Sequence, residues 1–261
     1  MPVTYTNPSF SFVERLVEIA QAGGEAAIRF YGPIGSVDQK ADGSPVTAAD
    51  AEAHAVIVTA LSRWDPSIPV ISEEGAVPPY EQRKQWRRFW LVDPLDGTKE
   101  FLAGNGEFTI NIALIEDAEP VFGVVVAPAL KTTFFAGRNI GAWRSEDGRP
   151  MARLATVPSS TGPVRVVESR SHPSPRLEEF IATLGRVQRI RLGSSLKFCR
   201  VAEGAADLYP RFGRTMEWDV AAGDCIYRNA GANGYKPHSP FVYNTPSLSS
   251  NEFVIGEARP R

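Results

Sequence analysis

The most informative stretch of the chain is residues 90–101, which read WLVDPLDGTKEF. An apolar β-rich run leads into a turn shaped by Pro94 and Gly97, and this turn carries two carboxylates, Asp93 and Asp96. A strand that fixes the base of the turn would hold these carboxylates rigidly, and oxygen ligands of this kind suit a hard cation such as Mg²⁺. An ordinary β-turn, in which the aspartates bond their own backbone, is the alternative for this stretch alone.

Two further acidic positions extend the pattern. The apolar run Ile68–Ile71 ends at Glu73 and Glu74, so a second neighbouring strand would deliver carboxylates to the same point. Asp219 opens a helix of small residues, where an aspartate ordinarily caps the helix and can also direct its second oxygen at a metal. Taken singly, the glutamates are equally compatible with a solvated loop, and Asp219 with a plain N-cap.

The apolar pattern divides the chain into two halves. Residues 1–150 predict two amphipathic helices, one over 11–31 with a capping box at Ser11–Glu14 and one after Thr47, followed by strands joined by short turns. This half is typical of helices on a largely antiparallel sheet, whereas residues 151–261 alternate strands with helices and predict an α/β half. The predicted strands are 68–71, 89–92, 108–115, 121–126, 132–136, 164–167, 187–192 and 206–209, and the later helices lie near 175–184, from 195 onward and over 219–230.

Charge follows the same division. The 261 residues include 30 acidic and 28 basic side chains, a net charge of −2, with 43% hydrophobic residues. This composition is that of an ordinary globular protein and disfavours disorder or a nucleic-acid polymer as partner. Residues 1–150 carry 20 acids and 13 bases, net −7, whereas residues 151–261 carry 10 acids and 15 bases, net +5. The second half therefore suits a small anion.

Cysteine usage and hydropathy bear on location. Cys199 and Cys225 cannot form a disulfide framework, which fits a reducing compartment. The N-terminal residues lack the features of an export signal, and no apolar run approaches the ~18–20 residues that a membrane span needs. We therefore expect a cytoplasmic protein with no integral membrane segment. Peripheral association with the inner membrane stays open, as does the choice between monomer and homodimer.

Together these features resemble the lithium-sensitive, Mg²⁺-dependent superfamily of inositol monophosphatases and bisphosphate nucleotidases. The resemblance rests on an ordered series of matches at residues 44–50, 72–74, 93–101, 105–111, 169–172, 193–199 and 218–219. It implies a mixed α+β and α/β fold, a layered αβαβα sandwich of the inositol monophosphatase and fructose-1,6-bisphosphatase type. The metals would lie between the two halves.

The resemblance also implies roles for single residues. Asp50 and Thr98 would orient and deprotonate an attacking water together with Glu73, although Asp50 also fits the fourth position of a capping box begun by Thr47. Glu74 would lie just outside the metal ligands, and Gly97, Thr98 and Asp219 would contact the substrate. The ligands of two or three Mg²⁺ ions would be Glu73, Asp93, the Leu95 carbonyl, Asp96 and Asp219.

Substrate identity is expected in the basic half. Ser194 and Ser195 precede a helix that carries Lys197 in its first turn, an arrangement suited to an anion, with plain serine capping as the alternative. Where Arg211 stands, inositol monophosphatases tend to place a glutamate that takes sugar hydroxyls, and a guanidinium favours a phosphate instead. Arg170 and His172 are further candidates for anion binding.

The resemblance, together with Arg211, implies hydrolysis of the 3′-phosphate of adenosine 3′,5′-bisphosphate to give AMP, extending to its sulfated precursor. The substrate is thus a small nucleotide bisphosphate. Two alternatives remain open: an inositol monophosphatase, which would share every metal ligand, and a catalytically inactive nucleotide-binding sensor.

Overall fold

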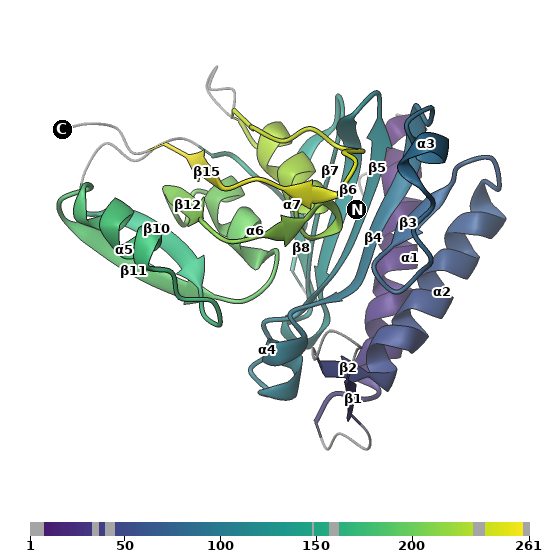
Figure 1. Cartoon of the computed structure of the whole chain (residues 1–261), viewed down its shortest axis with the longest axis horizontal. Coiled ribbons are helices and arrows are strands. Elements are labelled where there is room, and N and C mark those ends of the chain that lie inside the picture. Colours follow the sequence, from purple (N-terminus) through teal and green to yellow (C-terminus); the bar gives the residue numbers. More distant parts are fainter. Residues whose placement is uncertain are drawn as a thin grey trace.

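The elements of the computed structural model stack in five layers (Figure 1). It describes residues 8–32, 37–39, 45–147, 149–156, 162–231 and 238–257. Helices α1 (Pro8–Ile28) and α2 (Ala48–Trp64) cover one face of a seven-stranded sheet, and α6 (Leu196–Ala202) and α7 (Glu217–Asn229) cover the other. A four-stranded sheet and then α5 (Pro175–Ala182) follow. The predicted αβαβα sandwich is confirmed.

The large sheet positions the acidic residues. Its β3 pairs with β4 in parallel, and each later strand pairs antiparallel with the one before it. Trp90 and Val92 of β4 pack toward α1 and α2, whereas Phe89 and Leu91 pack toward the second half, because alternate side chains of a strand face opposite sides. In order across the sheet, the strands are β3 (Val70–Ser72), β4 (Arg88–Asp96), β5 (Thr109–Glu116), β6 (Glu119–Ala127), β7 (Thr132–Gly137), β8 (Gly141–Glu146) and β9 (Ala152–Arg153).

The second sheet is mixed and carries the basic residues. It has the order β11 (Val187–Leu192), β10 (Val164–Ser169), β12 (Leu208–Arg211) and β15 (Phe253–Gly256), with only β15 antiparallel to its neighbour. The smaller elements are β1 (Val37–Gln39), β2 (Pro45–Thr47), α3 (Tyr80–Arg83), α4 (Thr98–Leu102), a 3₁₀ turn (Pro128–Leu130), β13 (Thr215–Met216) and β14 (Ser249–Ser250). Among the helices of the described ranges, none is both long and apolar enough to cross a membrane.

Two helix starts differ from the prediction. Helix α1 begins at Pro8, so Ser11 lies inside it and does not cap it; a proline suits a first helical turn because its missing N–H has no partner there anyway. Asp219 is the third residue of α7, and its Oδ2 accepts a hydrogen bond from the backbone N–H of Met216 at 2.9 Å. Two further expectations concern parts of the chain that the structure does not describe. One is the capping of α2 by the Thr47 side chain, and the other is the lack of an export signal in residues 1–7.

Candidate active site

Two adjacent strands bring the first acidic residues together. Ser72 of β3 lies opposite Val92 of β4, and the backbone N–H of Glu73 donates to the Val92 carbonyl at 3.1 Å. Glu73 therefore leaves β3 beside Asp93. The expectation that neighbouring strands deliver both acidic clusters to one point is confirmed for these two residues.

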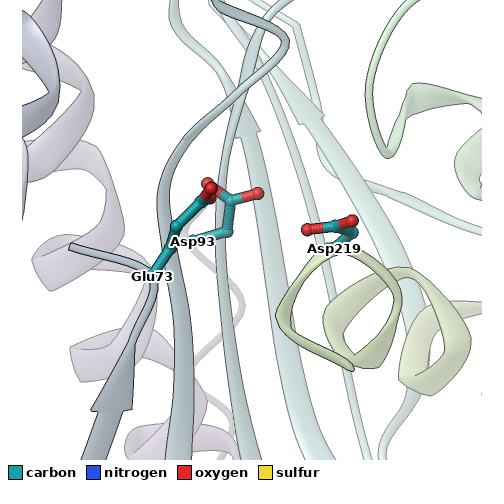
Figure 2. Close-up of side chains that lie close together, drawn as sticks. All are labelled: Glu73, Asp93 and Asp219. Carbon is teal, nitrogen blue, oxygen red and sulfur yellow. The ribbon is translucent and has the colours of Figure 1, made fainter. Parts of the chain in front are cut away.

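The third carboxylate comes from the other half of the chain. One carboxylate oxygen from each of Glu73, Asp93 and Asp219 lies within 4.8 Å of the other two. Figure 2 shows the Asp219 carboxylate reaching toward Asp93 from the start of α7. Its bond to the Met216 N–H fixes this position and leaves the second oxygen for another partner. Capping and ligation are compatible at Asp219.

The turn after β4 is held by its own sequence. The β4–β5 register shifts between Asp93 and Asp96, and the Leu95 N–H donates to Asp93 Oδ1 at 3.1 Å, so the backbone-bonded turn and the carboxylate pair coexist. Gly97 has φ of 93°, where other residues are strained, and reverses the chain so that Thr98 begins α4. Asp96 accepts a hydrogen bond from the Asn111 amide at 3.3 Å.

Burial and mutual repulsion dominate the electrostatics of these carboxylates. Burial raises the pKa of Asp93 well above its ordinary value, and the charges of Glu73, Asp96, Asp219 and Asp50 raise it further. Burial also raises the pKa values of Asp96 and Asp219. Several acids held this close, all offering oxygen, fit a hard divalent cation, which would neutralise them.

A cavity of about 310 Å³ opens beside the carboxylates. Of the predicted residues, Asp50, Asp93 and Leu95 are buried outside its wall, and Glu74 follows Glu73 in the turn after β3. The predicted residues that line the cavity are Glu73, Asp96, Gly97, Thr98, Ser194, Ser195, Lys197, Arg211 and Asp219.

The basic wall of the cavity holds polar groups poised for a ligand. The Lys197 ammonium is buried, donates to the Ser194 carbonyl and lies 5.6 Å from the Tyr209 ring centroid; burial lowers its pKa to about 8, against the opposing effect of Asp96. Within the described part of the chain, Arg211 Nε and Ser194 Oγ are buried without a hydrogen-bond partner. Buried donors of this kind are costly unless a ligand accepts from them.

Ser195 has a different role from capping. Its Oγ donates to the Asp219 carbonyl at 2.6 Å and accepts from the Asn111 amide at 3.0 Å, with no capping bond to α6. The same Asn111 amide also donates to Asp96. Ser195 therefore links the strand, helix and turn that carry the carboxylates.

Comparisons with known proteins agree with this geometry. The model of the inositol monophosphatase family matches residues 11–255. This chain belongs to the inositol monophosphatase family. The 3′(2′),5′-bisphosphate nucleotidase CysQ of Salmonella typhimurium is 49% identical over 239 residues, covering 91% of this chain and 95% of that protein.

Solved structures of the family superpose on the whole fold. CysQ from Bacteroides thetaiotaomicron, a bacterial member of the inositol monophosphatase family, has a TM-score of 0.80 at 39% identity and covers 96% of this chain and 98% of its own. An IMPase from Thermotoga maritima has a TM-score of 0.74 at 25% identity, covering 94% and 92%.

The two remaining candidates for anion binding, Arg170 and His172, differ in whether they line the cavity. Arg170 makes a two-pronged ion pair with Glu107, at 2.9 and 2.7 Å, and is outside the cavity lining. His172 does line the cavity, with Nε2 3.4 Å from the Lys99 Nζ, and burial together with Arg211 and Lys99 lowers its pKa.

Sequence reasoning left several cavity residues without a role. Lys99 and Glu100 lie in the stretch 90–101, and Arg214 lies in the basic half of the chain. Their positions in the sequence therefore indicated that they could line the site. Tyr209 reads as an ordinary strand aromatic and Thr215 as a loop residue. Only their tertiary placement brings these two to the cavity.

Proposed function

We propose that this chain is a Mg²⁺-dependent 3′(2′),5′-bisphosphate nucleotidase that hydrolyses the 3′-phosphate of adenosine 3′,5′-bisphosphate to give AMP and phosphate. The observation that carries the proposal is the opposition, across one cavity, of an acidic cluster and of two basic residues, the buried Lys197 and the half-buried Arg211. The relatives named 3′(2′),5′-bisphosphate nucleotidase CysQ support the same activity.

The acidic wall is the proposed metal centre. Two or three Mg²⁺ ions fit its oxygen donors, because Asp93 is buried beside the carboxylates of Glu73, Asp96 and Asp219, whose charges raise its pKa and which a divalent cation would neutralise. Bound Mg²⁺ supplies activation of water and neutralisation of phosphoryl charge. In this proposal residues 1–150 provide most ligands and residues 151–261 provide the last one. The proposed ligands are Glu73, Asp93, the Leu95 carbonyl, Asp96 and Asp219, with Glu74 beside them.

Residues at the edge of this proposed metal centre would orient and deprotonate the attacking water. Thr98 lines the cavity at the start of α4, where its hydroxyl would orient the attacking water, with Glu73 on the same wall. Asp50, buried in the first turn of α2 and close enough to raise the pKa of Asp93, would receive the proton. Gly97 and Asp219 border the space that the scissile phosphate would occupy.

The basic wall would select the substrate. A 5′-phosphate provides acceptors for Arg211 Nε, Ser194 Oγ and the Lys197 ammonium, and a sulfated phosphate at the same position would do likewise. An inositol monophosphate has only hydroxyls to offer there. These neutral hydroxyls can accept hydrogen bonds but leave the positive charges of Lys197 and Arg211 without an anion, which favours the bisphosphate.

A substrate panel tests the proposal. Phosphate release from adenosine 3′,5′-bisphosphate, its 5′-phosphosulfate analogue and inositol 1-phosphate would be measured with Mg²⁺ and with EDTA. We expect release from the two nucleotides, loss of all activity in EDTA, and slow release from inositol 1-phosphate. Preference for inositol 1-phosphate would identify an inositol monophosphatase, and binding without phosphate release would identify a sensor.

A further inference from the structure

We infer that Glu107 is a positioning residue: it holds the Gly193–Ser195 segment, and through it the Lys197 ammonium, in register with the turn that carries Asp96 and Thr98. The inference rests on the proposed function, because it concerns how the anion-binding wall is aligned with the acidic wall. Glu107 itself is absent from the cavity lining, so it would act through other residues.

One carboxylate joins three segments. Glu107 lies between α4 and β5, and its side chain is only 14% exposed. Its Oε2 accepts from the Gly193 N–H at 2.9 Å and from Arg170 Nε at 2.9 Å, and its Oε1 accepts from Arg170 Nη2 at 2.7 Å. Gly193 follows β11 and Arg170 follows β10, so Glu107 ties the acidic half to the ends of two strands of the basic half.

The backbone at residue 107 also sets the spacing between the two walls. A Cβ on Gly193 would lie 2.7 Å from the Glu107 carbonyl oxygen and 2.5 Å from Glu100 Cγ, which no side chain tolerates. A Cβ on Gly97 would lie 3.4 Å from the same carbonyl oxygen. The catalytic turn and the Gly193–Ser195 segment therefore pack around one peptide group. Ser171 donates to the Glu100 carboxylate as a second link.

The path from Glu107 to the cavity is short. Gly193 precedes Ser194, which lines the cavity and whose carbonyl accepts a hydrogen bond from the Lys197 ammonium. Releasing the Gly193 N–H would let this carbonyl move, and the ammonium with it. The geometry thus makes Glu107 important for binding the second phosphate rather than for water attack.

The role is separable from stability. Arg170 is 43% exposed, and ion pairs at that exposure contribute little to folding because solvent screens them. We therefore expect Arg170→Ala to leave the melting temperature close to that of the wild type.

Three variants test the inference: Glu107→Ala, Glu107→Gln and Arg170→Ala. Steady-state kinetics would be measured on adenosine 3′,5′-bisphosphate and on adenosine 3′-monophosphate, which lacks the second phosphate. We expect Glu107→Ala to raise KM for the bisphosphate about tenfold, with kcat and the monophosphate values within about twofold. Glu107→Gln keeps an oxygen for the Gly193 N–H, and Arg170→Ala keeps that bond intact, so each should give a smaller rise.

Glu203→Ala is the matched control. Glu203 accepts from Arg144 at 3.1 Å, another link between the halves, but lies outside the cavity lining; its loss should leave the substrate preference unchanged. Unchanged KM in folded Glu107→Ala, or equal losses on both substrates, would overturn the inference. Should Glu107→Ala fail to fold, the other two variants decide by the same criterion. A wild-type enzyme inactive on the bisphosphate would refute the proposed function instead.

Discussion

The Asp93 carboxylate is buried among other acids, and both burial and their charges raise its pKa. In its ionised form it therefore destabilises the metal-free fold, because the unfolded chain ionises it more easily. We predict that Asp93→Asn lowers phosphate release at least about a hundredfold, by removing a proposed metal ligand. The same variant should raise the metal-free melting temperature at pH 8, measured by scanning calorimetry.

Asp65 offers the contrasting control. It is partly exposed, and hydrogen bonds from Ser67 lower its pKa. Asp65→Asn should leave phosphate release unchanged and should not raise the melting temperature. If Asp93→Asn kept near-normal turnover, the metal centre would lie elsewhere.

Arg211 bears on selectivity in the same cavity. Its buried Nε has no hydrogen-bond partner among the described residues, so a ligand phosphate would satisfy it. Arg211→Glu should lower kcat/KM for adenosine 3′,5′-bisphosphate about a hundredfold, because an attractive charge becomes repulsive. Inositol 1-phosphate should be affected less. Arg87→Glu, which reverses an exposed surface arginine paired with Asp117, is the control, and an equal loss on both substrates at Arg211 would contradict the assignment.

Lys197 predicts a pH dependence. Burial lowers its pKa to about 8, so the ammonium is present below that pH and is lost as the pH rises through it. The ratio of kcat/KM for the bisphosphate over adenosine 3′-monophosphate should fall with rising pH, with a midpoint near 8, since kcat/KM reports groups of the free enzyme. Lys197→Arg keeps its charge and should flatten this fall. A ratio independent of pH in the wild type would remove Lys197 from the phosphate site.

At the scale of elements, the position of α7 depends on one glycine beneath it. A Cβ on Gly123 of β6 would lie 2.7 Å from Cys225 Cβ and 2.8 Å from the Ala222 carbonyl oxygen. Gly123→Ala should therefore push α7 off the sheet, costing about 1–3 kcal/mol as overpacking does. Because α7 carries Asp219, the Mg²⁺ concentration for half-maximal activity should rise as well.

Ile57→Val in α2 separates these two effects. It removes one buried methyl group on the opposite face of the sheet and costs about 0.5–1.5 kcal/mol without touching α7. Its Mg²⁺ requirement should match that of the wild type. An unchanged requirement in Gly123→Ala as well would show that α7 tolerates the methyl without displacing Asp219.

The elements that carry the site could be predicted because their sequences are strongly apolar. The runs that became β3 and β4 are continuous and lead into acidic residues, so their type and the meeting of Glu73 with Asp93 followed from the pattern, whereas α7 is marked by acidic residues in its first turn. Strand β8, GAWRSE, was missed because polar residues break its alternation. The hydrogen bonds of Ser195 and Glu107 join segments that are far apart in the sequence, so no local sequence pattern predicts them.

At the scale of the whole molecule, the two charge signs meet at one cavity. The acidic half contributes Glu73 and Asp96 to its wall, and the basic half contributes Lys197 and Arg211. The near-zero net charge of the chain thus combines an acidic half and a basic half, whose walls in this cavity complement a cation and an anion respectively. A divalent cation and a bisphosphate together would neutralise the acidic and the basic wall. We therefore expect the binding of each to favour the binding of the other.

The metal-free molecule should therefore be sensitive to pH as a whole. Asp93, Asp96 and Asp219 all have pKa values raised above the ordinary 3.8, so the folded chain binds more protons than the unfolded chain. Their contribution to stability consequently falls as the pH rises from about 4 through the raised values. Mg²⁺ binds the ionised form, so its stabilisation should be larger at pH 8 than at pH 5.

Differential scanning fluorimetry would measure this difference. Mg²⁺ at about 100 times its dissociation constant stabilises by about 2.7 kcal/mol, which for a chain of this size corresponds to a rise in melting temperature of roughly 5–10 °C at pH 8. At pH 5 the rise should be markedly smaller, because protons compete with the cation for the same oxygens. Asp93→Asn should lose most of the rise at pH 8, whereas an equal rise at both pH values would show that the cation binds outside the buried carboxylates.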